Sequence, residues 1–136
     1  MATTTELAPP APAGFKLSFD VTNLDKSCAF YQTLGGFVTA SASRAGQIFE
    51  TRDLTSSAYP GVHLVIRASF GKRAVGTSPG GITAISLPVP NLPAAIRRLS
   101  GKIRWVGASP EATPDEARAS VALIDPDGYQ IELYQA

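Results

Sequence analysis

The chain has 136 residues, which is enough for one compact domain with its own hydrophobic core. Its 12 Lys and Arg residues are interspersed with 11 Asp and Glu residues, and the net charge is only +1. Nucleic-acid binding requires a basic stripe, whereas the small pairs Lys72-Arg73 and Arg97-Arg98 are interpreted as solvated surface. The charge pattern therefore argues against a nucleic-acid partner.

The sequence also argues against a membrane partner, because no apolar stretch approaches the roughly 18 residues of a spanning helix. No basic segment followed by an apolar one marks a signal peptide. We therefore expect a cytoplasmic protein. Residues 1–14 are rich in Ala, Thr and Pro and lack periodicity, so they are predicted to form a flexible tail.

A short repeat indicates that the rest of the chain consists of two copies of one module. Val21-Thr22-Asn23-Leu24 returns 68 positions later as Val89-Pro90-Asn91-Leu92. Each copy closes a segment that alternates apolar and polar residues, as a half-buried strand does, and opens an amphipathic helical pattern. The alternating segments are Phe15 to Val21 and Thr83 to Val89.

Each predicted helix begins after an asparagine that can cap it, Asn23 in the first copy and Asn91 in the second. The first helix is predicted to end at Gly35-Gly36, which can supply a left-handed residue, and the second before Gly101. The only cysteine, Cys28, lies on the apolar stripe of the first helix. We expect it to be a small buried hydrophobe in preference to a reactive thiol.

Three further strands are predicted after each helix, which gives the order βαβββ twice. They are Phe37 to Ala42, Gln47 to Asp53 and Val62 to Ala68 in the first copy, and Ile103 to Gly107, Ala119 to Asp125 and Tyr129 to Tyr134 in the second. Turns are predicted at Ala58 to Gly61 and, with the proline and glycine of a type I turn, at Asp125 to Gly128. The predicted modules are residues 15–69 and 82–136, joined by a glycine-rich linker at 70–81.

These segments resemble the vicinal oxygen chelate superfamily, which contains glyoxalases, bleomycin-resistance proteins and extradiol dioxygenases. The residues that carry the resemblance are Asn23 to Ser27, Phe30-Tyr31, Leu34 to Phe37 and the closing segment Asp125 to Leu133. The resemblance implies an α+β fold of two βαβββ modules, whose mixed sheet curls around a cleft with the helices on the outside.

The resemblance also implies where metal ligands would lie, on cleft-facing positions of the first and last strands of each module. The two leading positions fall on Lys16, whose ammonium has no acceptor, and Ala84, which has no donor atom. Glu132 keeps a carboxylate on the closing strand, and the remaining position falls at or near His63 or Val65. Transition metals want three or four well-placed ligands, so we predict neither a metal site nor another cofactor.

If Lys16 and Glu132 both occupy ligand positions, they point at the same place in the cleft. We favour an ion pair between them, because a buried ammonium and carboxylate tolerate each other only as neighbours. In the alternative, the first strand is shifted in register and Lys16 extends its ammonium to water. His63, the only histidine, is interpreted as a cleft-lining residue in preference to a metal ligand, and it can also act as a general acid or base.

The implied lining of the cleft mixes aromatic surface with a few polar groups, which suits a small organic ligand. Besides Lys16, His63 and Glu132, it comprises Ser18, Asp20, Phe49, Thr51, Val65, Arg67, Ser86, Arg104 and Tyr134. Trp105 joins this lining or packs beneath the second helix, depending on the register of its strand.

The residues leave two classes of function open. The preferred one is metal-independent binding of a small aromatic or polycyclic molecule, as in the bleomycin-resistance proteins that the chain resembles. The alternative is a metal-independent isomerase, lyase or cyclase, with Glu132 or His63 as general base and Lys16 or Arg67 stabilising an anionic intermediate. Exposed sheet edges, together with the paired modules of the relatives, also predict a homodimer.

Overall fold

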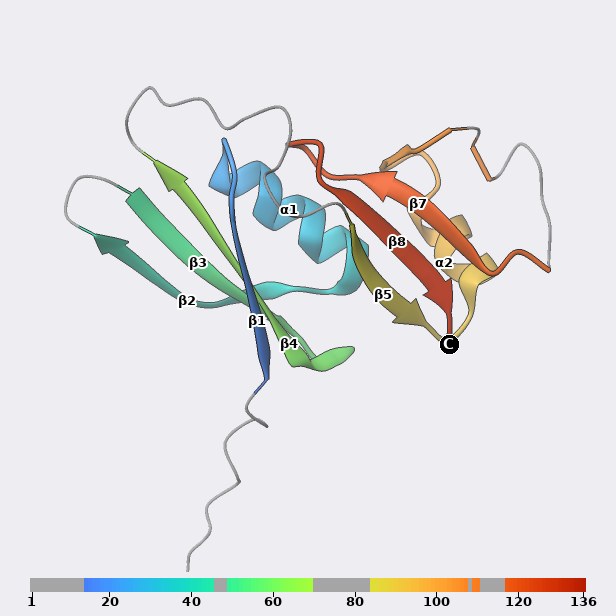
Figure 1. The fold of residues 1–136 in the computed structure, drawn as a ribbon, viewed down its shortest axis with the longest axis horizontal. Helices are drawn as coiled ribbons and strands as arrows, with labels where there is room; N and C mark the ends of the chain where they lie inside the picture. Colours follow the sequence, from blue (N-terminus) through green and yellow to red (C-terminus); the bar gives the residue numbers. More distant parts are fainter. Residues whose placement is uncertain (1–13, 46–48, 70–83, 108, 111–116) are drawn as a thin grey trace, which may run out of the picture. The chain divides into compact units, whose positions relative to one another are not determined.

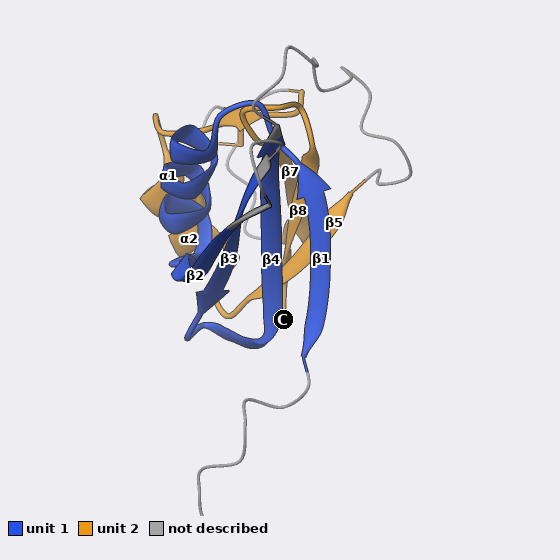
Figure 2. Ribbon diagram, turned by 90° about the vertical axis from the view of Figure 1, so that its left-hand side faces the viewer, with its two compact units in different colours: residues 1–74 blue, residues 75–136 orange. Residues whose placement is uncertain are grey.

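A computed structural model describes residues 14–45, 49–69, 84–107, 109–110 and 117–136. The chain divides into two compact units, Met1–Ala74 (unit 1) and Val75–Ala136 (unit 2). Within the described residues, each unit contains one four-stranded sheet and one helix, and Figure 1 and Figure 2 show their arrangement in each unit. The boundary falls in the segment predicted to be a linker, which lies outside the described residues, as does nearly all of the predicted tail.

Unit 1 has the order βαβββ. Strand β1 (Phe15–Asp20) is followed by helix α1 (Leu24–Gly35) and by strands β2 (Val38–Ala45), β3 (Phe49–Ser56) and β4 (Tyr59–Ser69). The strands lie in the order β1-β4-β3-β2, with β1 parallel to β4 and the other two pairs antiparallel. Figure 2 shows α1 on one side of this sheet, and among the described residues of unit 1 no helix lies on the opposite face.

Unit 2 repeats this arrangement. Strand β5 (Ile85–Val89) precedes helix α2 (Leu92–Leu99), and strands β6 (Arg104–Trp105), β7 (Ser120–Ile124) and β8 (Gln130–Gln135) follow. The sheet order is β5-β8-β7-β6, again with the first and last strands parallel and the other pairs antiparallel. The predicted α+β fold class with two βαβββ modules is confirmed.

Both helices begin where the sequence predicts. The side chain of Asn23 accepts a hydrogen bond from the backbone N–H of Lys26 at 3.0 Å, and Asn91 accepts one from Ala94 at the same distance. Gln135 of β8 supports the start of α2, because its Oε1 accepts the backbone N–H of Leu92 at 2.8 Å and its Nε2 donates to the carbonyl of Pro90 at 2.7 Å. Donors at the helix start that lack partners within the helix are thereby satisfied.

The core of each unit fills the space between its helix and its sheet. In unit 1 an edge-on contact between the rings of Phe19 and Tyr31, with centroids 5.9 Å apart, joins β1 to α1. The buried apolar residues of unit 1 are Phe19, Val21, Tyr31, Leu34, Phe37, Leu54, Leu64 and Ile66. Those of unit 2 are Leu87, Val89, Leu92, Ala95, Ile96, Leu99, Val121, Leu123, Tyr129, Ile131 and Leu133.

No helix among the described residues is long and apolar enough to span a membrane.

The expected burial of Cys28 is wrong. A helix turns by about 100° per residue, so α1 buries Ser27, Tyr31 and Leu34 against the sheet and carries Cys28 to the margin of that face. There its Sγ lies 3.6 Å from Nη1 of Arg52, and the cysteine is only half-buried.

Several predicted strand ends also differ from the structure. Strand β4 begins at Tyr59, so the turn predicted at Ala58 to Gly61 is shorter, and the register shift beside Ser56 accommodates Pro60 within the strand. Strand β6 has two residues in place of the predicted five, because Gly101 and Gly107 on either side have φ of 76° and 78°.

The predicted turn between β7 and β8 is confirmed. The backbone N–H of Gly128 donates to the carbonyl of Asp125 at 3.0 Å, which closes a four-residue turn. The buried side chain of Asp125 accepts the backbone N–H groups of Asp127 at 2.8 Å and Tyr129 at 2.9 Å. These bonds orient the start of β8.

Gly36, with a φ of 74°, ends α1 in the left-handed conformation that Gly35-Gly36 was predicted to supply. We expect Gly36→Ala to destabilise the protein by about 1 to 2 kcal/mol, because a Cβ is disfavoured in this region of φ. Crowding adds little, since the added Cβ would meet its nearest atom, Ser56 Oγ, at 3.6 Å. Chemical denaturation measures the loss.

Gly61→Ala is the matched control for this prediction. Gly61 lies outside the left-handed region, and an added Cβ there meets no atom within 4 Å. Its replacement should be close to neutral. Equal losses for the two variants would contradict the role assigned to the cap.

Candidate functional site

The side chains of the unit 1 sheet that point away from α1 form a polar surface, which we call open face 1. Strand register defines its members, since directly paired residues share a face: Lys16 pairs with His63, Ser18 with Val65 and Asp20 with Arg67. The alternate residues of β4, such as Leu64 and Ile66, are buried on the helix side. Open face 1 comprises Lys16, Ser18, Asp20, Ser41, Ser43, Thr51, Asp53, Thr55, His63, Val65 and Arg67.

The structure thus brings together on one face the residues of the first module that were predicted to line the site. Phe49 follows the same alternation along β3, since it pairs with Ser69 as Thr51 pairs with Arg67. Its side chain lies outside the described part of the chain. The alternation of β1 is therefore as predicted, with Lys16 and Ser18 on one face and the buried Phe19 on the other.

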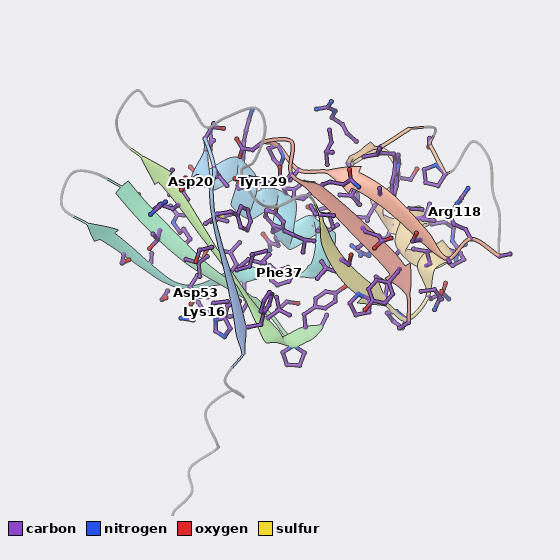
Figure 3. All side chains as sticks on the ribbon, viewed as in Figure 1. Lys16, Asp20, Phe37, Asp53, Arg118 and Tyr129 are labelled. Carbon is purple, nitrogen blue, oxygen red and sulfur yellow. The ribbon has the colours of Figure 1, made fainter. Side chains whose placement is uncertain are left out.

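A three-residue cluster of Lys16, Asp53 and His63 occupies one end of open face 1. One carboxylate oxygen of Asp53, Oδ1, lies 2.9 Å from Nδ1 of His63, and the other, Oδ2, lies 3.6 Å from Nζ of Lys16. The side chains of Asp53 and His63 are 18% and 21% exposed, whereas that of Lys16 is 63% exposed. Figure 3 shows Lys16 and Asp53 side by side.

Asp53 was not among the predicted site residues. The alternation that placed Phe49 and Thr51 on the open face also places Asp53 there, two residues further along β3. The predicted strand ends at this residue. The observed strand continues to Ser56.

The other end of open face 1 carries an ion pair between β1 and β4. Nε of Arg67 donates to Oδ1 of Asp20 at 2.8 Å, and both side chains are nearly half exposed. The hydrogen bond to Asp20 and the negative charge of that carboxylate raise the pKa of Arg67, so its guanidinium stays charged. At this exposure the pair contributes little to stability, and its charges remain accessible from solvent.

Open face 2 is the corresponding surface of unit 2 and carries Ser86, Arg104, Glu132 and Tyr134, all of which were predicted to line the site. The register pairs Ser86 with Glu132, and Ser86 Oγ donates to Oε1 of Glu132 at 2.7 Å. Tyr134 is 39% exposed. Trp105 pairs with the buried Leu123 and lies on the opposite face, so the interpretation that it packs on the side of α2 holds.

The register also settles which residue of unit 1 corresponds to Glu132. Ser18 pairs with Val65 in unit 1, and Ser86, its counterpart in the repeat, pairs with Glu132 in unit 2. Val65 is therefore the counterpart of Glu132, and His63 lies two residues before that position.

The four positions at which the superfamily resemblance implies metal ligands are then Lys16, Val65, Ala84 and Glu132. Only Glu132 offers an oxygen ligand, so this donor set does not fit a transition metal. Within the described residues, no three His, Cys, Asp or Glu side chains are grouped so as to hold a metal ion.

A second charged cluster lies on the helix side of unit 1, around Arg52. Its guanidinium contacts Oε2 of Glu50 at 3.3 Å, Sγ of Cys28 at 3.6 Å and Oδ1 of Asp25 at 3.8 Å. Burial lowers the pKa of Arg52, whereas its interactions with Cys28 and Glu50 raise it, and the net shift is upward. This cluster ties α1 to β3 and is separate from open face 1.

No family model matches the chain, and no curated protein matches it in sequence. Solved structures do match its fold. The trypanothione-dependent glyoxalase I of Leishmania major superimposes with a TM-score of 0.69 and 19% identity, covering 88% of this chain and 84% of that one. TnmS3, an antibiotic binding protein from a Streptomyces species, gives a TM-score of 0.63 and 20% identity, covering 96% of this chain and 98% of its own.

A variant of the fosfomycin resistance protein FosX from Listeria monocytogenes also matches, with a TM-score of 0.62, 16% identity and coverage of 92% and 93%. That structure contains Mn(II) and a dihydroxypropylphosphonic acid. The chain therefore has the fold of the vicinal oxygen chelate superfamily, as the resemblance implied.

The ion pair predicted between Lys16 and Glu132 would join the two units and stays a prediction. Each residue has a partner in its own unit, Asp53 for Lys16 and Ser86 for Glu132. If the pair forms, Lys16→Met and Glu132→Gln should be non-additive in unfolding free energy by about 1 kcal/mol or more. A double-mutant cycle by chemical denaturation measures this coupling.

The matched control replaces Lys16→Met with Lys26→Met, which removes the same charge from an exposed position on α1. That cycle should be additive to within about 0.5 kcal/mol. Additivity in both cycles would mean that Lys16 has only its exposed pair with Asp53, which contributes at most about 1 kcal/mol.

Proposed function

We propose that the protein binds a small aromatic or polycyclic molecule without a metal ion, through the open faces of its two sheets. The observation that supports this most is the cluster of Lys16, Asp53 and His63 on open face 1. Half-buried charged groups are costly unless they have partners or a use, so their concentration on one surface favours a binding site.

Open face 2 carries further groups that suit such a ligand. Glu132 offers a carboxylate acceptor, Tyr134 a partly exposed aromatic ring and Arg104 an exposed cation. Aromatic surface combined with a few fixed polar groups is typical of sites for drug-sized ligands. The match to an antibiotic binding protein over nearly its whole length is compatible with such a role.

A bound metal ion, such as the Mn(II) in the FosX structure, is not part of this proposal. The reason is the donor set, since Lys16, Val65 and Ala84 stand at three of the four implied ligand positions. A lysine ammonium has no lone pair to offer, and the other two side chains are hydrocarbon.

A metal-independent isomerase, lyase or cyclase is the second candidate. The hydrogen bond between Asp53 and His63 favours it, because a carboxylate-supported imidazole is a suitable general base. Glu132 is the alternative base, and Lys16 or Arg67 supplies the positive charge for an anionic intermediate.

Equilibrium dialysis against bleomycin, mitomycin C and alizarin, with and without EDTA, tests the proposal. We expect at least one compound to bind with a micromolar Kd that EDTA leaves unchanged, and to be recovered intact. Elemental analysis of the dialysed protein should find far less than one transition metal per chain. Loss of binding in EDTA would contradict metal independence, conversion of the compound would establish the enzyme alternative, and no binding across the panel would overturn the proposal.

A pair of arginine substitutions tests the location of this site. Ser18→Arg places a long cation on β1, between Lys16 and Asp20 on open face 1. It should raise the Kd by roughly tenfold or more, which corresponds to about 1.4 kcal/mol. Ala29→Arg adds the same group to the exposed surface of α1 and should leave Kd unchanged. Equal effects of the two substitutions would place the site elsewhere.

We also propose a homodimer, because each sheet ends in strands that have a neighbour on only one side within that sheet, β1 and β2 in unit 1 and β5 and β6 in unit 2. Edge strands with unpaired backbone groups favour pairing with another chain. Light scattering at micromolar concentrations should give twice the mass of one chain. The mass of a single chain throughout this range would contradict the dimer.

A further inference from the structure

We propose that open face 1 recognises a weakly acidic hydroxyl group, as in a phenol or an enol, by accepting its proton on Nε2 of His63. Asp53 acts as the positioning residue, and Lys16 stabilises the resulting anion. This inference rests on the proposed function, because the hydroxyl belongs to the bound molecule.

The contact between Asp53 and His63 defines which ring nitrogen carries a proton. An ionised carboxylate only accepts hydrogen bonds, so at 2.9 Å from Oδ1 the Nδ1 of the imidazole must be the donor. In the neutral ring, Nε2 then holds a lone pair and is the basic atom. Among the described residues of unit 1, none forms a hydrogen bond with Nε2.

Strand pairing holds this arrangement in place. Asp53 pairs with Val65 across β3 and β4, and His63 pairs with Thr55, so the carboxylate and the imidazole are diagonal neighbours on one face. Both side chains are about one-fifth exposed, which limits the screening of their interaction by water. Nζ of Lys16, on β1, lies 3.6 Å from the other carboxylate oxygen of Asp53.

The charges on open face 1 suit the transfer of one proton from a ligand. With a neutral imidazole, the charged groups that face it are Lys16 and Arg67 against Asp20 and Asp53, and they sum to zero. When the O–H bond of the ligand breaks and an N–H bond forms at Nε2, the face gains one positive charge and the ligand becomes an anion. Asp53 stabilises the imidazolium, and the exposed ammonium of Lys16 is available to the oxygen anion.

This role is distinct from metal binding. The register places Val65, and not His63, at the counterpart of Glu132. His63 therefore lies on the same face as the position at which the superfamily resemblance implies a ligand, but two residues away from it along β4. Its partner is a carboxylate that occupies Nδ1, so Nε2 is the nitrogen that can accept a proton from a ligand.

The first test uses the fact that His63 is the only histidine. Nitrogen-15 NMR of the free protein, at a pH where the imidazole is neutral, should show a protonated Nδ1 and a bare Nε2. Asp53→Asn should abolish this preference and Asp53→Glu should retain it, whereas Asp20→Asn, which removes a carboxylate from the same face, should not change it. A proton on Nε2 in the wild type would overturn the inference.

The second test follows the ionisation of a phenolic probe. Alizarin and 4-nitrophenol absorb at longer wavelength as anions, so absorbance at a pH where the free probe is neutral shows whether the bound probe has lost its proton. We expect an ionised bound probe in the wild type, and a neutral one bound roughly tenfold more weakly in His63→Gln and Asp53→Asn. Lys26→Met should behave as the wild type.

The outcomes separate this inference from the proposed function. A probe that binds to the wild type but stays neutral overturns the inference and leaves the binding function standing. Failure of both phenols to bind also overturns the inference, even if bleomycin or mitomycin C binds. An ionised probe in the wild type that remains ionised in His63→Gln would assign the proton acceptor to another residue.

Discussion

In the parts of the chain that the structure describes, each sheet packs against one helix, which covers one of its two faces. This constraint determines which strand residues are buried in the core and which lie on the open faces. Because successive residues of a strand point to opposite faces, Phe19, Leu64 and Ile66 are committed to the core, and their neighbours must be polar enough to remain uncovered. The candidate site is therefore a direct consequence of the alternation that builds the fold.

The same alternation explains why a cluster can form between residues far apart in sequence. Lys16, Asp53 and His63 come from three strands that are neighbours in the sheet, and each points away from the helix. Their contacts follow from strand register, which the buried leucines and isoleucine of the other face fix. A slip by one residue would bury Lys16 and His63 in the core, at a free-energy cost that isolated charges make prohibitive.

The repeat, the helix starts and the face of each strand could be predicted because short-range physics determines them. Asn23 and Asn91 cap their helices through a bond to a backbone N–H three residues on, and the alternation of β1 is visible in its own six residues. Strand ends and the burial of Cys28 could not be predicted. Strand ends depend on the pairing between strands, and the burial of Cys28 depends on how α1 is rotated over the sheet. Both are properties of packing between distant segments.

The partners of charged side chains could not be predicted from the sequence either. The sequence places Lys16 and His63 on one face, but the choice of Asp53 as their shared partner depends on the register of β3 against β4. That register results from the pairing of distant strands, which the residue types alone do not specify.

The two modules share a backbone but differ in what their open faces carry. Core positions must keep apolar side chains of suitable volume in both copies, since any polar replacement there would lose burial energy and leave an unsatisfied group. Open-face positions are free of that requirement. Val65 and Glu132 occupy equivalent places, and so do Lys16 and Ala84, yet their chemistry has nothing in common. Side chains on these faces can therefore differ without disturbing the core, which is how one fold can carry different chemistry in different proteins.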